Sequence, residues 1–192
     1  NTITISTGSF DMNQMTVRAA ALKVALSLTP GSQNVVGGGQ RVHFATLDLD
    51  ATQSGEDVRI SAVPIVPTMT TMTASEVTYC QLYDGATPLN TGGNVPTSLP
   101  SASATNFTFD NTLTIAKGTV KSLALKCDVA ASVSAADTTA WTITSANWNS
   151  TGVISGASIT ETFGNLTGGT MTVQVGALAV TTDSLSPAYT IA

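Results

Sequence analysis

The chain has 192 residues, of which 10% are charged and 5% aromatic, and its formal net charge is −5 at pH 7. With only seven Lys and Arg residues, the composition argues against nucleic-acid binding and against a polybasic membrane anchor. No run of about eighteen apolar residues occurs, so we expect no membrane span. The length is sufficient for a domain with its own hydrophobic core.

Short segments of alternating apolar and polar residues, separated by Gly, Pro, Asn and Asp, predict β-strands. In VKSLALKCDVA (120–130), alternate residues from Leu123 to Val129 would face the core, with Lys126 and Asp128 outside. Further strands are expected in QRVHFATLDLD (40–50), DVRISAVPIV (57–66), EVTYCQLYDG (76–85), ATNFTFDNTLTIAKG (104–118), AWTITSANW (140–148) and GVISGASITETF (152–163). Such a series predicts an all-β fold, an Ig-like β-sandwich.

Two of these segments have informative phases. The alternation in 40–50 changes phase, which predicts a β-bulge near Ala45. In 76–85, Cys80 and Leu82 would share the core face, and regular alternation then places four residues on the opposite face: Val77, Tyr79, Gln81 and Tyr83.

The chain has two cysteines, Cys80 and Cys127, and both are predicted to point to the core. A buried disulfide between neighbouring or facing strands is therefore expected; the alternative is two unrelated buried thiols. An even cysteine pair in a Lys-poor, Thr-rich β chain favours an oxidising compartment. We therefore expect the protein to be extracellular or on the cell surface.

The two ends of the chain resemble each other. MTVRAAALKV (15–24) and MTVQVGALAV (171–180) agree at six of ten positions, at an offset of 171 − 15 = 156. Upstream, Ile3, Thr4 and Gly8 match Ile159, Thr160 and Gly164; downstream, after one residue of slippage, Leu28-Thr29-Pro30 matches Leu185-Ser186-Pro187. Such a match at a fixed offset indicates a tandem repeat, and we call residues 1–36 and 157–192 the terminal repeat.

The terminal repeat suggests a division of the chain. Residues 1–14 are predicted to form an N-terminal strand extension, 15–170 a β-sandwich domain, and 171–192 a C-terminal strand that repeats 15–36 and could be donated to a neighbour. Both copies, 15–28 and 171–185, are expected to be strands, and an unpaired apolar strand seeks a partner. The predicted contacts between subunits are Ile3, Ile5, Val173, Leu178 and Val180.

At QRVHFATLDLDATQSGEDVRI, TYCQLYDGATPLN, TIAKGTVKSLALKCDV and MTVQVGALAVTTDSLSPAYTIA, the sequence resembles a family of repetitive bacterial cell-surface proteins. These proteins are S-layer-like or adhesin-like, are built from tandem Ig-like β-sandwich modules, and are frequent in uncultivated, small-celled lineages. The resemblance covers most of the chain. It implies an extracellular structural role and brings no catalytic residues with it.

Residues that could carry chemistry are few. His43 is the only histidine and is expected on the surface, so neither a His-based metal site nor a Ser-His-Asp triad gains support. The acidic residues Asp48, Asp50, Glu56 and Asp57 could bind Ca²⁺, but they lack EF-hand spacing and are interpreted as a solvated turn. We expect no cofactor, no metal and no enzymatic activity.

Three further features of the sequence bear on function. The glycines at 37–39 predict a flexible turn that would let the first strand leave its domain. Trp141 and Trp148 could form a sugar-binding platform, although a tryptophan in a strand is more often part of the core. Glycosylation triplets occur at three positions, of which the second is favoured because it lies in a loop: Asn106, Asn149 and Asn165.

The sequence therefore favours a structural subunit of an extracellular filament or surface array. Identical subunits would polymerise head-to-tail by strand exchange, since a heterologous contact that does not close gives an open filament. The alternative is an adhesin-type binding module that recognises a glycan or a partner protein through its loops.

Overall fold

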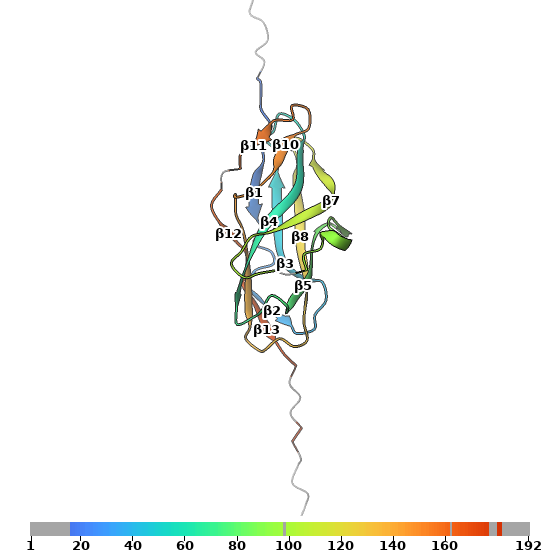
Figure 1. The fold of residues 1–192 in the computed structure, drawn as a ribbon. Helices are drawn as coiled ribbons and strands as arrows, with labels where there is room; N and C mark the ends of the chain where they lie inside the picture. The colour runs from blue at the N-terminus through green and yellow to red at the C-terminus, as the bar shows by residue number, and fades with distance from the viewer. Residues whose placement is uncertain (1–15, 98, 162, 177–179, 182–192) are drawn as a thin grey trace, which may run out of the picture.

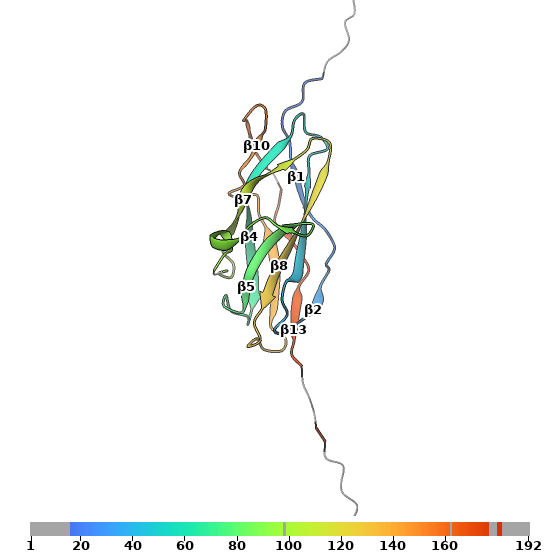
Figure 2. The ribbon, with the colours of Figure 1, turned by 90° about the vertical axis from the view of Figure 1, so that its right-hand side faces the viewer.

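A computed structural model describes residues 16–97, 99–161, 163–176 and 180–181. Within these residues the chain forms thirteen strands and one short 3-10 helix, η1 (Gly92–Asn94). The strands make two sheets that face each other across one core, and the molecule is elongated along the strands (Figures 1 and 2). This architecture confirms the predicted all-β sandwich.

The first sheet has five strands, all antiparallel to their neighbours. Their order is β1 (Lys23–Leu26), β3 (Val42–Asp50), β8 (Val120–Val129), β5 (Val77–Asp84) and β6 (Thr87–Pro88). The second sheet has the order β11 (Ser158–Ile159), β10 (Ser150–Gly152), β4 (Val58–Thr70), β9 (Thr138–Ile143), β13 (Met171–Gln174) and β2 (Gln33–Val36). In addition, β7 (Thr105–Ile115) pairs with β4, and β12 (Leu166–Thr167) pairs with β9.

The beginning of the chain is divided between the two sheets. β1 lies at the edge of the first sheet against β3, and β2 lies at the edge of the second sheet, parallel to β13. Without β2, the orders β1-β3-β8-β5 and β4-β9-β13 are those of the A-B-E-D and C-F-G sheets of an immunoglobulin constant domain. The sandwich is thus closed by β13 from its own chain.

The core lies between the sheets, where the apolar positions of alternating strands meet. Phe44 on β3 and Trp141 on β9 pack with ring centroids 5.7 Å apart and join the two sheets. The residues of β8 that were expected to face the core are all buried: Leu123, Leu125, Cys127 and Val129. Four apolar residues of β7 are buried with them: Phe107, Phe109, Leu113 and Ile115. The predicted bulge is also present, since the β3–β8 register shifts between His43 and Ala45.

Cys80 on β5 and Cys127 on β8 form a disulfide, and both side chains are fully buried. Because β5 and β8 are neighbours, the bridge joins two strands of one sheet. The predicted disulfide is therefore confirmed, in its neighbouring-strand form.

The predicted phase of β5 is wrong at its beginning. Val77 is 1% exposed and so lies on the core side with Cys80, although regular alternation places it on the opposite face. The β5–β8 register shifts between Thr78 and Gln81, and this bulge adds a residue that reverses the phase. Tyr83, also expected to face outward, is only 5% exposed.

The ends of the sandwich differ from the predicted boundaries. Met171–Gln174 form β13, which pairs with β9 and β2, so the sandwich extends past 170 to Gln174. At the other end, residues 16–22 are not in a strand, and the first strand begins at Lys23. Similar sequence segments in the two copies of the terminal repeat therefore belong to different structural elements within this chain.

The two ends of the sandwich carry the two ends of the described chain (Figure 1). We call one end the N-pole: it contains residues 16–22 and the loops 51–57, 116–119 and 153–157. The other end, the C-pole, contains the loops 37–41, 71–76 and 130–137 and the residues that follow β13 (175–176). The chain thus enters at one end of the long axis and leaves at the opposite end.

Candidate functional site

At the N-pole, the β3–β4 turn holds the main chain that leads into β1. The Gly55 N–H donates to the Ala19 carbonyl at 2.9 Å, and the Ala21 N–H donates to the Ser54 hydroxyl oxygen at 3.1 Å. A Cβ added at Gly55 would lie 2.1 Å from the Arg18 carbonyl oxygen, so only glycine permits this approach. We call Ser54 and Gly55 the main-chain clamp.

Glu56 fixes a second loop at the same pole. Its Oε2 atom accepts hydrogen bonds from the Ile154 and Ser155 N–H groups at 2.5 and 2.9 Å. The Ser155 side chain, and after it the main-chain N–H groups of Ser155 and Ile154, interact with the Glu56 carboxyl and lower its pKa below the ordinary value. Burial opposes the shift. Glu56 is thus an ionised acceptor that anchors the β10–β11 loop.

At the C-pole the turn that follows β2 is hydrogen-bonded to the end of β13. The Gly37 N–H donates to the Gln174 carbonyl at 3.1 Å, and the Gly38 N–H donates to the Ala130 carbonyl at 3.2 Å. Gly38 has φ = +82°, a conformation that glycine adopts without strain. The predicted glycine turn is therefore present, although its hydrogen bonds hold it against the sandwich.

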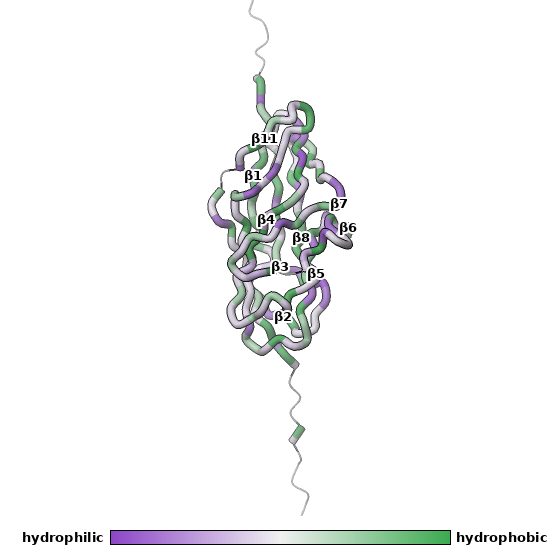
Figure 3. The backbone as a smooth tube through the Cα atoms, in the orientation of Figure 1, coloured by the Kyte–Doolittle hydropathy of each residue, from purple (hydrophilic) through white to green (hydrophobic). Residues whose placement is uncertain are grey.

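Both poles expose apolar side chains. Val17 is 93% and Ile154 86% exposed at the N-pole, and Val36 is 64% and Val175 41% exposed at the C-pole. Figure 3 colours the β10–β11 loop and the segment that leaves β13 as hydrophobic. Because burying apolar surface is favourable, these ends are suited to contact with other protein surfaces.

The predicted subunit contacts fall in three environments. Val173 on β13 is fully buried in the core of its own chain, so its side chain is not available to a neighbouring subunit in this fold. Val180 is 78% exposed, beyond the sandwich. Ile3, Ile5 and Leu178 lie outside the described residues.

Tyr79 on β5 faces outward as predicted, but the alternation did not predict a binding surface around it. Tyr79 lies in the β5 bulge with φ = +52°, a conformation that costs a non-glycine residue free energy, and it is 67% exposed. On one side it borders a hollow of about 190 Å³ lined by Gln40, Arg41, Gln81 and Asp128. On the other it borders a hollow of about 280 Å³ lined by Thr78, Gly92, Val95, Pro96 and Thr97. We call this the Tyr79 surface.

His43 and the acidic residues of the predicted turn make hydrogen bonds within the fold. His43 is half-buried and its Nε2 lies 2.9 Å from the Thr46 hydroxyl. Burial lowers the pKa of His43, with the Lys126 charge adding to the effect and the Ala45 hydrogen bond opposing it. The carboxylates of the predicted acidic turn accept hydrogen bonds from separate donors: Ser122 to Asp48, Thr52 to Asp50 and Lys117 to Asp57. Among the described residues, no three His, Cys, Asp or Glu side chains form a potential metal site.

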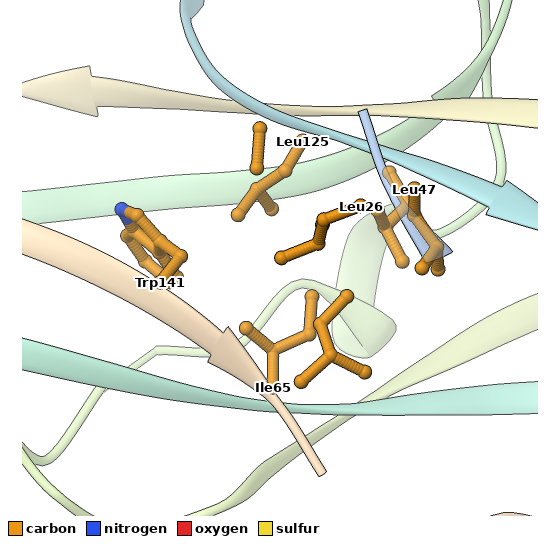
Figure 4. A pocket seen from close by; sticks show the side chains of 8 residues that line it. Leu26, Leu47, Ile65, Leu125 and Trp141 are labelled. Carbon is orange, nitrogen blue, oxygen red and sulfur yellow. The ribbon is translucent and has the colours of Figure 1, made fainter. Parts of the chain in front are cut away.

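The two tryptophans belong to the packing. Trp141 is 1% exposed and lines an internal cavity of about 10 Å³ between the sheets, together with Leu26 from β1 (Figure 4). A cavity of that size holds at most one water molecule, so it is a packing gap. Trp148 packs edge-on against Phe163 at 5.8 Å and donates its ring N–H to the Thr144 carbonyl. The two side chains make separate contacts and form no common sugar platform.

A buried carboxyl lies near β1. Glu161 is 8% exposed and accepts a hydrogen bond from the Ser150 hydroxyl at 2.5 Å. Burial raises the pKa of Glu161, and the Ser150 hydrogen bond opposes that shift. Glu161 also borders a shallow hollow with Leu22, Lys23 and Val24. Its hydrogen-bond partner is the Ser150 hydroxyl and not a second carboxyl group.

All three asparagines of the glycosylation triplets are exposed: Asn106, Asn149 and Asn165. Asn106 alternates with the buried Phe107 on β7, so its side chain points away from the core aromatics. The expected advantage of Asn149 over Asn106 therefore disappears.

No helix among the described residues is long and apolar enough to cross a membrane. No protein-family model matches the chain, and no curated protein matches it. Among solved structures, the chain is similar to a family 123 glycoside hydrolase from Clostridium perfringens, whose analysis concerned glycolipid glycan hydrolysis. The TM-score is 0.34 and the identity 8%, over 81% of this chain and 27% of that chain. A similarity at this level says nothing about the activity of this chain.

Proposed function

We propose that the protein is a structural subunit of an extracellular filament or surface array whose subunits join head-to-tail. The observation that carries the proposal is the placement of the two ends of the described chain at opposite poles of an elongated sandwich (Figure 2). A subunit with this geometry presents different surfaces at its two ends. Repeated contact between unlike ends then extends a line instead of closing a dimer.

Two further observations support the proposal. Apolar side chains are exposed at both poles, as end-to-end contact requires. The terminal repeat gives each end of the chain a segment patterned like part of the sandwich, which suits strand exchange between subunits.

The disulfide supports an extracellular or cell-surface location. Cys80 and Cys127 are bridged, and structural disulfides form and persist in oxidising environments. The exposed asparagines would be accessible to a glycosylating enzyme there, so a glycoprotein form is included in the proposal.

Negative-stain imaging of the purified chain at rising concentration tests the function. We expect threads with an axial repeat of roughly 40 Å, because the thirteen residues of β4 rise by about 3.3 Å each along the sandwich. Single particles at every concentration would reject a self-assembling subunit.

A second candidate function, an adhesin-type binding module, is favoured by the Tyr79 surface. An exposed ring beside Arg41, Gln81 and Asp128 offers one apolar face and several hydrogen-bonding groups, the combination that sugar rings and peptides use. Titration of a saccharide panel by NMR would test it. Shifts that saturate and are lost in Tyr79→Ala, but kept in Val120→Ala at an exposed site on β8, would support the second function.

A further inference from the structure

The elements of the fold locate the boundary between successive copies of the terminal repeat. Residues 157–174 contain β11, β12 and β13, and their counterparts at an offset of 156 are residues 1–18. Residues 19–36 contain β1 and β2; the counterparts of 19–27 are residues 175–183, and after the one residue of slippage those of 28–35 are residues 185–192. The boundary therefore falls directly after β13, at Gln174 and at the matching Arg18.

Two pairs of matched residues differ in burial between the two copies of the terminal repeat. Val173 is fully buried, whereas its counterpart Val17 is 93% exposed. Val24 on β1 is 4% exposed, whereas its counterpart Val180 is 78% exposed. Each exposed valine repeats a residue that the sandwich buries, so each lacks the sheets that would cover it.

We infer that residues 175–192 of one subunit occupy the β1–β2 position of a second copy of the chain, at its N-pole. This inference rests on the proposed head-to-tail assembly and specifies its register. Val180 takes the place of Val24 opposite Leu49, and Leu178 takes the place of Leu22.

The topology favours the C-terminal segment as the donor. β1 and β2 are edge strands with one partner strand each, so a competing segment can replace them without opening a sheet. Residues 15–18 repeat β13, which lies between β9 and β2, and a donor there would have to break two ladders. Exchange at the β1–β2 edge position therefore breaks fewer strand pairings than exchange at the β13 position.

The main-chain clamp suits the incoming segment. Gly55 and Ser54 bind main-chain atoms of Ala19 and Ala21, whose counterparts are Val175 and Ala177. Because main-chain hydrogen bonds do not depend on side-chain identity, the clamp accepts either sequence. Val175 and Gly176 are already exposed where they leave the C-pole.

The segment cannot fill the position in its own subunit. Six residues link Gln174 to Val180 and span at most about 21 Å when extended. The sandwich is roughly 40 Å long, and the two sites lie at opposite poles (Figure 1). A copy stacked on the C-pole brings its N-pole within reach of the segment.

The resident strand has the better fit. Leu26 and the buried Val35 have smaller counterparts in Thr182 and, after the slippage, Ala192. The donor thus buries less apolar surface than the resident segment. Because exchange joins two subunits, we expect the population of the exchanged form to rise with protein concentration.

A cysteine pair in the full chain tests the register. Ala25 lies opposite Asp48 in the β1–β3 ladder, and the counterpart of Ala25 is Thr181. In Asp48→Cys with Thr181→Cys, interchain disulfides should form and give a ladder of dimer, trimer and larger bands on a non-reducing gel. The matched control, Asp48→Cys with Val180→Cys, should lose the ladder because position 180 would face the core. Ala25→Cys with Asp48→Cys should form an intrachain bridge and so reports that β3 is folded.

The outcomes separate this inference from the proposed function. A ladder that depends on position 181 supports the register. Equal ladders for positions 180 and 181, or monomers in preparations that still form threads, overturn the register and leave the assembly standing. Monomers in preparations that form no threads overturn both.

Discussion

Val173 is fully buried between the sheets, and Val17, its counterpart in the terminal repeat, is 93% exposed at the opposite pole. The valines of the two Met-Thr-Val segments therefore occupy two different environments in one chain. In β13 the segment pairs with two strands, and at the N-pole it precedes the clamp without a strand partner among the described residues. This contrast is the reason to look for the missing partner in another copy.

Substitution of Gly55 should release the chain that enters the sandwich. In Gly55→Ala the new Cβ would meet the Arg18 carbonyl oxygen at 2.1 Å, so the clamp must open. We expect trypsin to cleave after Arg18 faster in this variant, as measured by mass spectrometry. Gly93→Ala is the control, because nothing lies within 4 Å of a Cβ there. Equal cleavage in both variants would mean that the clamp does not protect this bond.

Neutralising the buried acid should stabilise the fold at neutral pH. The pKa of Glu161 is raised in the folded chain, so folding loses stability as pH rises through that value and the buried carboxyl ionises. Glu161→Gln keeps an acceptor for Ser150 and removes the charge. We expect a higher melting temperature than wild type at pH 7, and a difference that shrinks at about pH 3.5, below the ordinary carboxyl pKa. A gain of the same size at both pH values would contradict the account.

Glu56 should behave in the opposite way. Its pKa is lowered, so its contribution is present above the ordinary carboxyl pKa and is lost as pH falls through the folded value. Glu56→Gln should therefore destabilise the chain at neutral pH, with a difference that disappears in acid. Hydrogen exchange should quicken at the Ile154 and Ser155 amides, which Glu56 holds. Unchanged exchange there would show that the loop does not depend on the carboxylate.

Loss of the disulfide should cost a measurable part of the stability. The bridge closes a loop of 47 residues, which in the chain-entropy model contributes about 4 kcal/mol. For a domain of this size that corresponds to roughly 10 °C in melting temperature. Cys80→Ser with Cys127→Ser should melt lower by that amount and no longer respond to a reducing agent. A wild-type melting temperature in the double variant would refute the estimate.

Local patterns predicted much of the fold and little of the poles. The inward phase of Cys127 and the bulge near Ala45 could be predicted because each depends on alternation within one strand. The β5 bulge at Tyr79 could not, since an added residue there breaks the alternation from which the phase is inferred. The clamp was missed because Ser54 and Gly55 acquire their role only when a distant segment approaches.

The terminal repeat was informative in a similarly limited way. It indicates which residues of two copies correspond, but the position of an element boundary inside the repeat depends on pairing. β13 ends at Gln174 because its ladder with β2 ends there. The boundary expected at 170 therefore separated β13, the last strand of the sandwich, from the rest of the domain.

Light scattering of the full chain and of a chain ending at Gln174, over the same concentration range, tests the central claim most directly. The shorter chain keeps all the strands that the structure describes, β1 to β13, and lacks the proposed donor. The account predicts that the mass of the full chain rises with concentration and that the shorter chain stays monomeric and folded. Equal masses for the two chains at every concentration would contradict it.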